Sequence, residues 1–339
     1  MVTSRPRMNE QRLRKSPNIA IVGSTSLLGK ELQAMLEDRG FPIGRLALLE
    51  TEEYAGLLQE FAGEIQITQV ISPDVFEDID IAFFTCSPEI MHAYVDSGAT
   101  FPELTIDLTQ AGRGGTMYLE GISDPRLLRP KGYFVNPHPA AIVIARTLSS
   151  LHKTFGVQSA AITVLQPASE RGNTGVDELQ SQTVSLLNFQ EIEHTVFEGQ
   201  LAFNVLPEAA ASEQAENRIL EQLIGILGET FPKPIVTAVQ VPVFHSHAFS
   251  LFVYLLDAPE IDQLMTHLNQ PGITTDVPQG GSSPVGVVGT ESIHVGRIRQ
   301  DANRAGAYSL WLVADNIRVA ASNAIQTAEH IMFAPALEM

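Results

Sequence analysis

The chain has 339 residues, of which 44% are hydrophobic and 18% are charged, a composition typical of a globular protein with about two domains. Its formal net charge of −18 argues against a nucleic-acid or anionic-membrane partner. The single cysteine, Cys86, excludes an intramolecular disulfide and favours the cytoplasm. We find no apolar run of membrane-spanning length and no signal peptide, and we expect residues 1–17 to form a mobile basic tail.

From residue 18 the sequence alternates short apolar strands with amphipathic helices. Strands are expected at 18–22, 46–49, 65–71, 79–85, 104–109 and 133–135, and helices at 28–38 and 88–97. Such alternation predicts an α/β fold with a mostly parallel, doubly wound sheet. We assign residues 18–135 to this Rossmann-like domain.

The pattern changes after residue 135 to an α+β style. Strands are expected at 157–165, 236–243 and 249–255, and helices at 176–187, 216–227 and 259–268. The strands at 236–243 and 249–255 are predicted to be antiparallel. We assign residues 136–314 to a second, α+β domain, and we expect a small-residue helix over 315–333 to pack back onto the first domain.

A sharp strand-to-helix joint is predicted at the boundary between the two domains. The strand 133–135 stops at Asn136 and Pro137, and an apolar helix starts at about Ala140. Prolines on both sides of His138 suit such a joint because proline fixes φ and cannot donate a backbone hydrogen bond. A joint of this kind directs a side chain and helix N-terminal N–H groups at one point, which suits an anion or a nucleophile.

The segment between the first strand and the first helix reads GSTSLLG, with a glycine at each end. In a Rossmann-like loop the glycines allow a tight turn, close approach to a pyrophosphate and close helix packing. Ser26 fills the middle position, where its Cβ takes room from the phosphates although its hydroxyl could bond one. The candidate dinucleotide-binding residues of this loop are Gly23, Thr25, Ser26, Leu27, Leu28 and Gly29.

An acidic residue, Glu50, ends the second expected strand. At this position an acid would accept hydrogen bonds from the adenine-ribose hydroxyls and repel a 2′-phosphate, which favours NAD over NADP. The alternative interpretation is an acidic surface loop, because Glu52 and Glu53 follow closely.

By these motifs the chain resembles the aspartate-semialdehyde dehydrogenase family from residue 18 nearly to its end. The loop GSTSLLG is similar to that family's GATGAVG, and NPHPAA at 136–141 is similar to its NPNCST. The segment LQPASERGNTGVDEL is similar to YQAVSGAG and the following helix. Further matching segments are QLAFNVLPE at 200–208, QVPVFHSHAFS at 240–250, VGRIRQD at 295–301 and LWLVADNIRVAASNAIQ at 310–326.

The resemblance implies a glyceraldehyde-3-phosphate dehydrogenase-like fold and a homodimer formed through the second domain. It also implies reductive dephosphorylation of β-aspartyl phosphate with NADPH. In that chemistry a cysteine forms a thioacyl intermediate, a histidine acts as acid and base, and a glutamine orients the acyl group. Gln166 and His247 match the glutamine and the histidine.

Several family residues are replaced in this sequence. Pro139 stands at the position of the cysteine, and without a thiolate the covalent route is lost. Gln240 replaces the arginine that grips the substrate carboxylate, which removes a bidentate clamp. Ala215 stands where a glutamate should hold the substrate ammonium. Glu53 and Tyr54 replace the arginine and serine that bind the 2′-phosphate, which disfavours NADP.

Other positions are retained and leave an anion site conceivable. Arg113 matches an arginine of the family's phosphate-binding loop, and Arg218 takes the place of a lysine in the same role. Asn316, in the matching tail, is a candidate cofactor contact. The plainer interpretation is that the two arginines are surface residues and that His247 is a packed histidine.

Two features could replace the lost chemistry. Cys86 could supply a thiol, but a lone cysteine after an apolar strand is usually a small buried hydrophobe. His138, His245 and His247 could converge on one metal ion if the last two point to the same side of a strand. Packed or solvated histidines are the commoner outcome.

We therefore predict a catalytically degenerate homologue that acts as a non-catalytic, dimeric binding or regulatory protein. Its partner would be a small anionic metabolite or another protein. The alternative is an active NAD(P)-dependent oxidoreductase of amino-acid metabolism that transfers hydride directly to a semialdehyde or another aldehyde without a covalent thiol intermediate.

Overall fold

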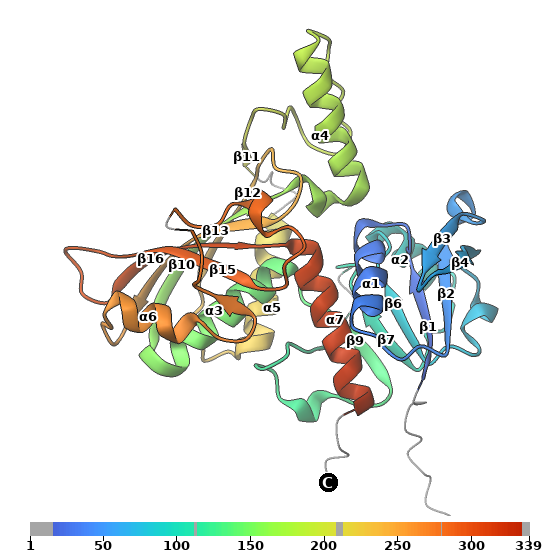
Figure 1. Cartoon of the computed structure of the whole chain (residues 1–339), viewed down its shortest axis with the longest axis horizontal. Coiled ribbons are helices and arrows are strands. Elements are labelled where there is room, and N and C mark those ends of the chain that lie inside the picture. Colours follow the sequence, from blue (N-terminus) through green and yellow to red (C-terminus); the bar gives the residue numbers. More distant parts are fainter. Residues whose placement is uncertain (1–15, 112–113, 208–212, 279, 334–339) are drawn as a thin grey trace, which may run out of the picture.

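The computed structural model describes residues 16–111, 114–207, 213–278 and 280–333. Two seven-stranded sheets lie side by side, and the helix α7 (Asn316–Phe333) runs between them (Figure 1). Of the predicted basic tail, residues 1–15 lie outside the described residues. Among the helices that are described, none is long and apolar enough to cross a membrane.

The first sheet is parallel throughout and has the strand order β5-β2-β1-β6-β7-β9-β8. Its helices are α1 (Leu27–Asp38) and α2 (Pro88–Asp96). The predicted doubly wound fold is confirmed, and the strand order reverses beside β1, where open α/β sheets bind ligands. The strands are β1 (Asn18–Val22), β2 (Arg45–Glu50), β5 (Gln69–Val70), β6 (Ile81–Phe84), β7 (Leu104–Asp107), β8 (Thr116–Met117) and β9 (Gly132–Val135).

The expected strand over 65–71 is wrong as a single element. Its first part, β4 (Glu64–Ile67), pairs antiparallel with β3 (Leu58–Phe61) in a separate hairpin, and only β5 joins the main sheet. Thr68 divides the two parts because its buried hydroxyl donates to the carbonyl of Tyr54 (2.7 Å) and accepts the N–H of Leu57 (2.9 Å). These bonds attach Thr68 to the segment before β3.

The second sheet has the order β11-β12-β10-β13-β16-β15-β14. The two strands predicted to be antiparallel, β12 and β13, do run in opposite directions, and β10 lies between them. Because the chain crosses over from β10 to β12 through helices, these two strands pair in parallel, and β13 takes the other edge of β10. The strands are β10 (Val157–Gln166), β11 (Leu206–Pro207), β12 (Ile235–Gln240), β13 (His247–Leu255), β14 (Ile273–Thr274), β15 (Ile293–Gln300) and β16 (Ala307–Ala314).

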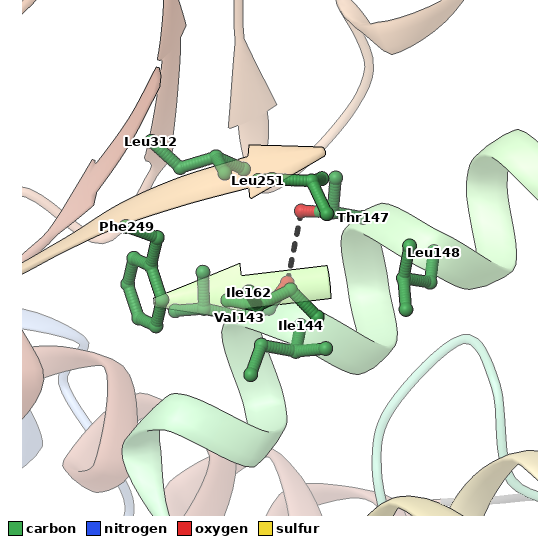
Figure 2. Close-up of a pocket in the computed structure, with 8 residues that line it drawn as sticks. All are labelled: Val143, Ile144, Thr147, Leu148, Ile162, Phe249, Leu251 and Leu312. Carbon is green, nitrogen blue, oxygen red and sulfur yellow. Dashed lines mark hydrogen bonds between the residues drawn. The ribbon is translucent and has the colours of Figure 1, made fainter. Parts of the chain in front are cut away.

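One face of the second sheet is covered by α3 (Pro139–Phe155), α5 (Glu213–Leu227) and α6 (Ile261–Leu268). Figure 2 shows apolar side chains of α3 facing those of β10, β13 and β16. The hydroxyl of Thr147, within this apolar layer, donates to the carbonyl of Val143 (2.9 Å), so it is not left unpaired. Each fully buried large apolar side chain stabilises the fold by about 1.5–3 kcal/mol. This packing fixes the position of the N-terminus of α3.

The last helix, α7 (Asn316–Phe333), packs against α1 of the first domain, as predicted. Ala321, Ala324 and Ala328 lie in the core of that domain and allow the two helices to approach closely. Because α7 follows directly on β16 of the second sheet, it joins the two halves of the molecule. By contrast, α4 (Gly172–Leu187) projects away from both sheets (Figure 1).

Candidate functional site

The predicted joint between β9 and α3 is present and is held by hydrogen bonds. His138 is the N-cap of α3, and its Nδ1 accepts the backbone N–H of Ala140 (3.1 Å). Pro139 takes the first helical position, where a missing N–H costs nothing. The backbone N–H of His138 donates to Oε1 of Gln222 on α5 (2.7 Å). These bonds hold the first residues of α3 in a fixed position.

Three polar side chains form a row at the end of that sheet. Gln166, the last residue of β10, is paired with Gln240, the last residue of β12. The pairing of Leu165 with Ala248 continues the antiparallel register so that Gln166 lies opposite His247, the first residue of β13. Directly opposed residues share a face of a sheet. The face of the sheet that α3 covers is therefore apolar along most of its length and ends in three polar side chains, those of Gln240, Gln166 and His247.

Glu170 brings the joint and the polar row together. It lies in the short 3-10 helix η4 (Ala168–Arg171) directly after β10. Its Oε1 is 2.5 Å from Nε2 of His138, and its Oε2 is 2.9 Å from Nε2 of His247. The second contact has the length of an ion pair but not the angle of a good hydrogen bond. The two imidazole planes are inclined by 28°, with centroids 6.0 Å apart.

The electrostatics of this cluster keep Glu170 ionised. Burial by itself would raise the pKa of the Glu170 carboxyl, but the imidazoles of His138 and His247 hold it well below its usual 4.5. Because Nδ1 of His138 accepts a hydrogen bond, the neutral ring of His138 carries its proton on Nε2, facing the carboxylate. The cluster is therefore a carboxylate held between two imidazole groups.

A second set of hydrogen bonds supports the cluster from behind. The buried amide of Asn316 accepts the N–H of Ser246 (3.0 Å) and donates to the hydroxyl of Ser169 (3.2 Å). It thereby joins the turn before β13 to the turn that carries Glu170. Gln222 also donates to Gln110 (2.9 Å), which ties α5 to the first domain. Asn316, predicted as a cofactor contact, is used in these internal bonds.

Of the two arginines in the predicted anion site, the structure describes only Arg218. Arg218 lies on α5, one helical turn before Gln222 and so on the side of the helix that meets His138. Ala215 lies on the same helix. Arg113 lies outside the described residues. The anion site predicted from the two arginines stays a prediction.

In the predicted nucleotide loop the two glycines lie as close to neighbouring backbone as expected. A Cβ at Gly23 would lie 2.5 Å from the backbone of Cys86, and one at Gly29 would lie 2.3 Å from the carbonyl of Gly23. The hydroxyl of Ser26 caps α1, since it accepts the N–H of Gly29 (2.9 Å) and donates to the carbonyl of Thr85 (3.0 Å). It is thus already paired in both directions.

Glu50 is folded back onto this loop. Its buried Oε1 accepts the N–H of Thr25 (2.5 Å) and the hydroxyl of Ser24 (3.2 Å). The loop N–H that could face a pyrophosphate is therefore bonded to a carboxylate, whose charge would oppose a phosphate. Glu53 and Tyr54, in the exposed turn η1 (Glu52–Tyr54), add no positive charge. In this arrangement a carboxylate lies against the N–H of Thr25, which disfavours a phosphate at that point of the loop.

Cys86 lies in the apolar core of the first domain and packs beside Gly23. Burial, with smaller contributions from nearby carboxylates, raises the pKa of its thiol to about 12. A thiol with such a pKa is protonated and inert near neutrality.

The geometry expected of the histidines is wrong. The strand begins only at His247, His245 lies in the bend before it, and Ser246 between them has φ +76°. The alternation that would place both rings on one side of a strand therefore does not apply. In the described part of the chain no group of three or more His, Cys, Asp and Glu side chains is arranged to hold a metal ion.

The residue that sequence analysis missed is Glu170. A signal was present, because Glu170 occupies the place of the first glycine of GAG in the segment similar to YQAVSGAG. Gln222 was missed as well, and it has no motif that would have identified it.

Known proteins resemble this chain over nearly its whole length. Residues 18–117 match the family described as semialdehyde dehydrogenase, NAD binding domain, and residues 148–319 match semialdehyde dehydrogenase, dimerisation domain. The chain is 29% identical to the aspartate-semialdehyde dehydrogenase of Bacillus subtilis, with 93% of this chain and 97% of the relative covered. It is 30% identical to that of Rickettsia conorii, with 94% and 98% covered.

The fold of a solved structure agrees with these matches. The crystal structure of aspartate semialdehyde dehydrogenase II from Vibrio cholerae, complexed with ASA, superposes with a TM-score of 0.84 and 27% identity. The superposition covers 94% of this chain and 98% of that one.

Proposed function

Because the chain belongs to the aspartate-semialdehyde dehydrogenase family, we propose that it is a homologue without thiol-dependent acyl chemistry, acting as a non-catalytic, dimeric binding or regulatory protein. The observation that carries the proposal is the cluster at the N-terminus of α3. Pro139 stands where the family resemblance implies a cysteine, and Glu170 lies between the two nearest histidines. A site of this composition lacks the nucleophile for a covalent intermediate.

The position of Glu170 supports the view that the catalytic machinery has lost more than the cysteine. His247 matches the family's acid/base histidine, yet its Nε2 lies 2.9 Å from the Glu170 carboxylate. A histidine so held has one nitrogen directed at a fixed anion rather than at a substrate. The same carboxylate would repel an acyl phosphate, and Gln240 offers no positive charge to offset it.

The nucleotide loop supports the same conclusion. With Thr25 bonded to Glu50 and the hydroxyl of Ser26 used as a helix cap, the loop has few groups left for a pyrophosphate. The proposed function therefore uses no nicotinamide cofactor.

The proposal of a homodimer draws on the match of residues 148–319 to a family described as a dimerisation domain. Large apolar side chains also stand exposed on and after the projecting helix α4, at Leu187, Phe189 and Phe203. Large apolar side chains that are left exposed commonly mark a protein interface when they gather in one patch. Sedimentation velocity on the full chain is expected to give a dimer, and a monomer at micromolar concentration would contradict this part of the proposal.

The decisive test is the phosphate-dependent oxidation of aspartate β-semialdehyde, measured with NAD and with NADP. We expect no turnover by the wild-type chain, and none by Pro139→Cys or its matched control Pro139→Ser, because Glu170 and Gln240 remain. Turnover by the wild type at the rate of an active relative would refute the proposal. Recovery in Pro139→Cys alone would show that the cysteine is the only loss. Calorimetric titration is expected to detect tight binding of neither cofactor, whereas tight NAD binding would favour an oxidoreductase.

A further inference from the structure

A cavity of about 300 Å³ lies at the N-terminal edge of the first sheet, opposite the edge that carries the nucleotide loop. It is lined by residues 76–80, which lead into β6, and by residues 100–103, which lead into β7. These two segments lie side by side because β6 and β7 are parallel neighbours, with Ile81 opposite Leu104. The joint before α3 follows the other, C-terminal ends of the strands, so the cavity is a separate feature of the molecule.

The lining of this cavity is strongly acidic. It includes four carboxylates, those of Glu77, Asp78, Asp80 and Glu103. Glu103 forms an ion pair with Lys131. Glu77 and Asp78 are exposed, and in the described part of the chain no lysine, arginine or histidine forms an ion pair with either of them. Carboxylates gathered in this way repel one another, and a cation that binds among them relieves the repulsion.

An aromatic ring contributes to the same lining. Phe101 is half-buried and continues an aromatic cluster through Tyr94 and Tyr133, with ring centroids 5.3 Å and 5.1 Å away. An arginine guanidinium is weakly hydrated, stacks on aromatic rings and donates to carboxylates, so this combination suits an arginine side chain. The carboxylates do not suit a metal ion, since none of the described residues form a group arranged to hold one.

The chain itself carries arginines close to the cavity. The segment before residue 16 has one acidic residue and five basic residues, which are Arg5, Arg7, Arg12, Arg14 and Lys15. Asn18, at the start of β1, is bonded to two residues of the lining. Its backbone N–H donates to the carboxylate of Asp80 (2.8 Å), and its side-chain amide donates to the carbonyl of Asp78 (2.8 Å).

The length of the segment allows it to reach the cavity. The described chain begins at Ser16, and an extended residue spans about 3.3–3.6 Å, so Arg14 and Arg12 are attached within about 7–14 Å of Ser16. A short tether gives an effective concentration of the order of millimolar, so that weak contacts are enough for binding. The match to the family's NAD binding domain starts only at residue 18, and the segment is therefore a feature of this chain rather than of that domain.

We propose that the acidic cavity binds the basic N-terminal segment of its own chain, with arginines of residues 5–14 against Glu77, Asp78 and Phe101. The segment that sequence analysis expects to be a mobile tail is thereby held on the first domain at low ionic strength. This inference does not rest on the proposed function, because the cavity shares no residue with the cluster around Glu170 or with the nucleotide loop.

Electron paramagnetic resonance of a nitroxide on the full-length Gln11→Cys variant tests whether the segment is held. The label attaches selectively at this position because the native cysteine, Cys86, is buried. At low ionic strength we expect a slow-motion component in the spectrum. It should be lost at about 1 M sodium chloride, where the screening length is about 3 Å. A fully mobile spectrum at low ionic strength, or a slow component that persists at high salt, would overturn the proposal.

Variants of the cavity locate the binding. In the labelled chain, Glu77→Gln together with Asp78→Asn should lower the ratio of held to mobile label by at least about threefold, since exposed ion pairs contribute modestly. The matched control, Glu60→Gln together with Glu64→Gln, changes two exposed carboxylates of the hairpin and should leave the spectrum unchanged. Equal effects of the two pairs, or no effect of either, would refute the site.

Variants of the segment provide the answer if those of the cavity do not fold. Arg12→Gln together with Arg14→Gln alters residues that precede the described chain and should release the label to a similar extent. An unchanged spectrum would show that these arginines do not hold the segment, and it would contradict the proposal.

Co-expression distinguishes the chain's own segment from that of a second copy. A Gln11→Cys chain that also carries Glu77→Gln and Asp78→Asn is produced with an excess of a chain whose cavity is intact and whose Arg12 and Arg14 are replaced by glutamine. After labelling, the nitroxide should stay mobile, because its own cavity is altered. A held label would show binding to the cavity of a second copy and would overturn the assignment to the same chain.

Discussion

Replacing Glu170 with glutamine removes the negative charge from between two imidazoles while it keeps the size of the side chain. In the native site the two carboxylate oxygens lie 2.5 Å and 2.9 Å from Nε2 of His138 and of His247. The amide can still accept one hydrogen bond through its oxygen. Its NH₂ group, however, must then face the other Nε2, where a donor meets a donor.

The size of the effect follows from these contacts. Hydrogen bonds to a charged group contribute about 1.5–3 kcal/mol each, and removing one partner of a buried pair costs about 3–5 kcal/mol. Because the amide retains one of the two contacts, we expect Glu170→Gln to lower the free energy of unfolding by about 2–4 kcal/mol at neutral pH.

The pH dependence has a definite sign. The pKa of Glu170 is held well below 4.5 in the folded chain, while the unfolded chain takes up its proton near 4.5. The stabilisation by the carboxylate is therefore fully present above about pH 4.5 and is lost as the pH falls below it. The difference in the free energy of unfolding between the wild type and Glu170→Gln should therefore become smaller as the pH falls below about 4.5.

Urea denaturation at several pH values measures this difference. The fluorescence of Trp311, the only tryptophan, reports unfolding of the second sheet, where its Nε1 donates to the carbonyl of Ser282 (2.9 Å). The exposed control Glu198→Gln should leave the midpoint unchanged. A Glu170→Gln variant as stable as the wild type at pH 7, or one whose deficit persists undiminished at pH 4, would refute the argument.

Three further predictions concern packing and capping. Gly29→Ala should lower the free energy of unfolding by about 1–3 kcal/mol, because the new Cβ would lie 2.3 Å from a carbonyl oxygen. Thermal denaturation should show no change for the control Gly199→Ala, since no atom lies within 4 Å of a Cβ at that position. Cys86, buried and with a pKa of about 12, should resist iodoacetamide at pH 8 until urea unfolds the chain, and rapid native labelling would contradict its packing. Gln182→Ala should cost about 1–3 kcal/mol, because its Oε1 accepts two backbone N–H groups of the segment after α4, and the exposed Gln180→Ala should cost nothing measurable.

Local sequence signals were sufficient for most of the elements. The alternation of apolar strands and amphipathic helices predicted the parallel first sheet, and the prolines around His138 predicted the joint before α3. The run of small residues in α7 predicted its return to the first domain. These signals work because periodicity, proline and side-chain size act on the backbone within a few residues.

Only the tertiary structure decided which distant groups meet. Nothing near Glu170 in the sequence predicts that one carboxylate contacts both His138 and His247, which lie 32 and 77 residues away along the chain. The same holds for Glu50, which looked like a ribose ligand and is bonded to Thr25. The neighbours of β10 also depend on which crossover packs, and local pattern does not encode that choice. Sequence periodicity fixes how a segment folds, whereas the side chains that it meets are set by the packing of the whole chain.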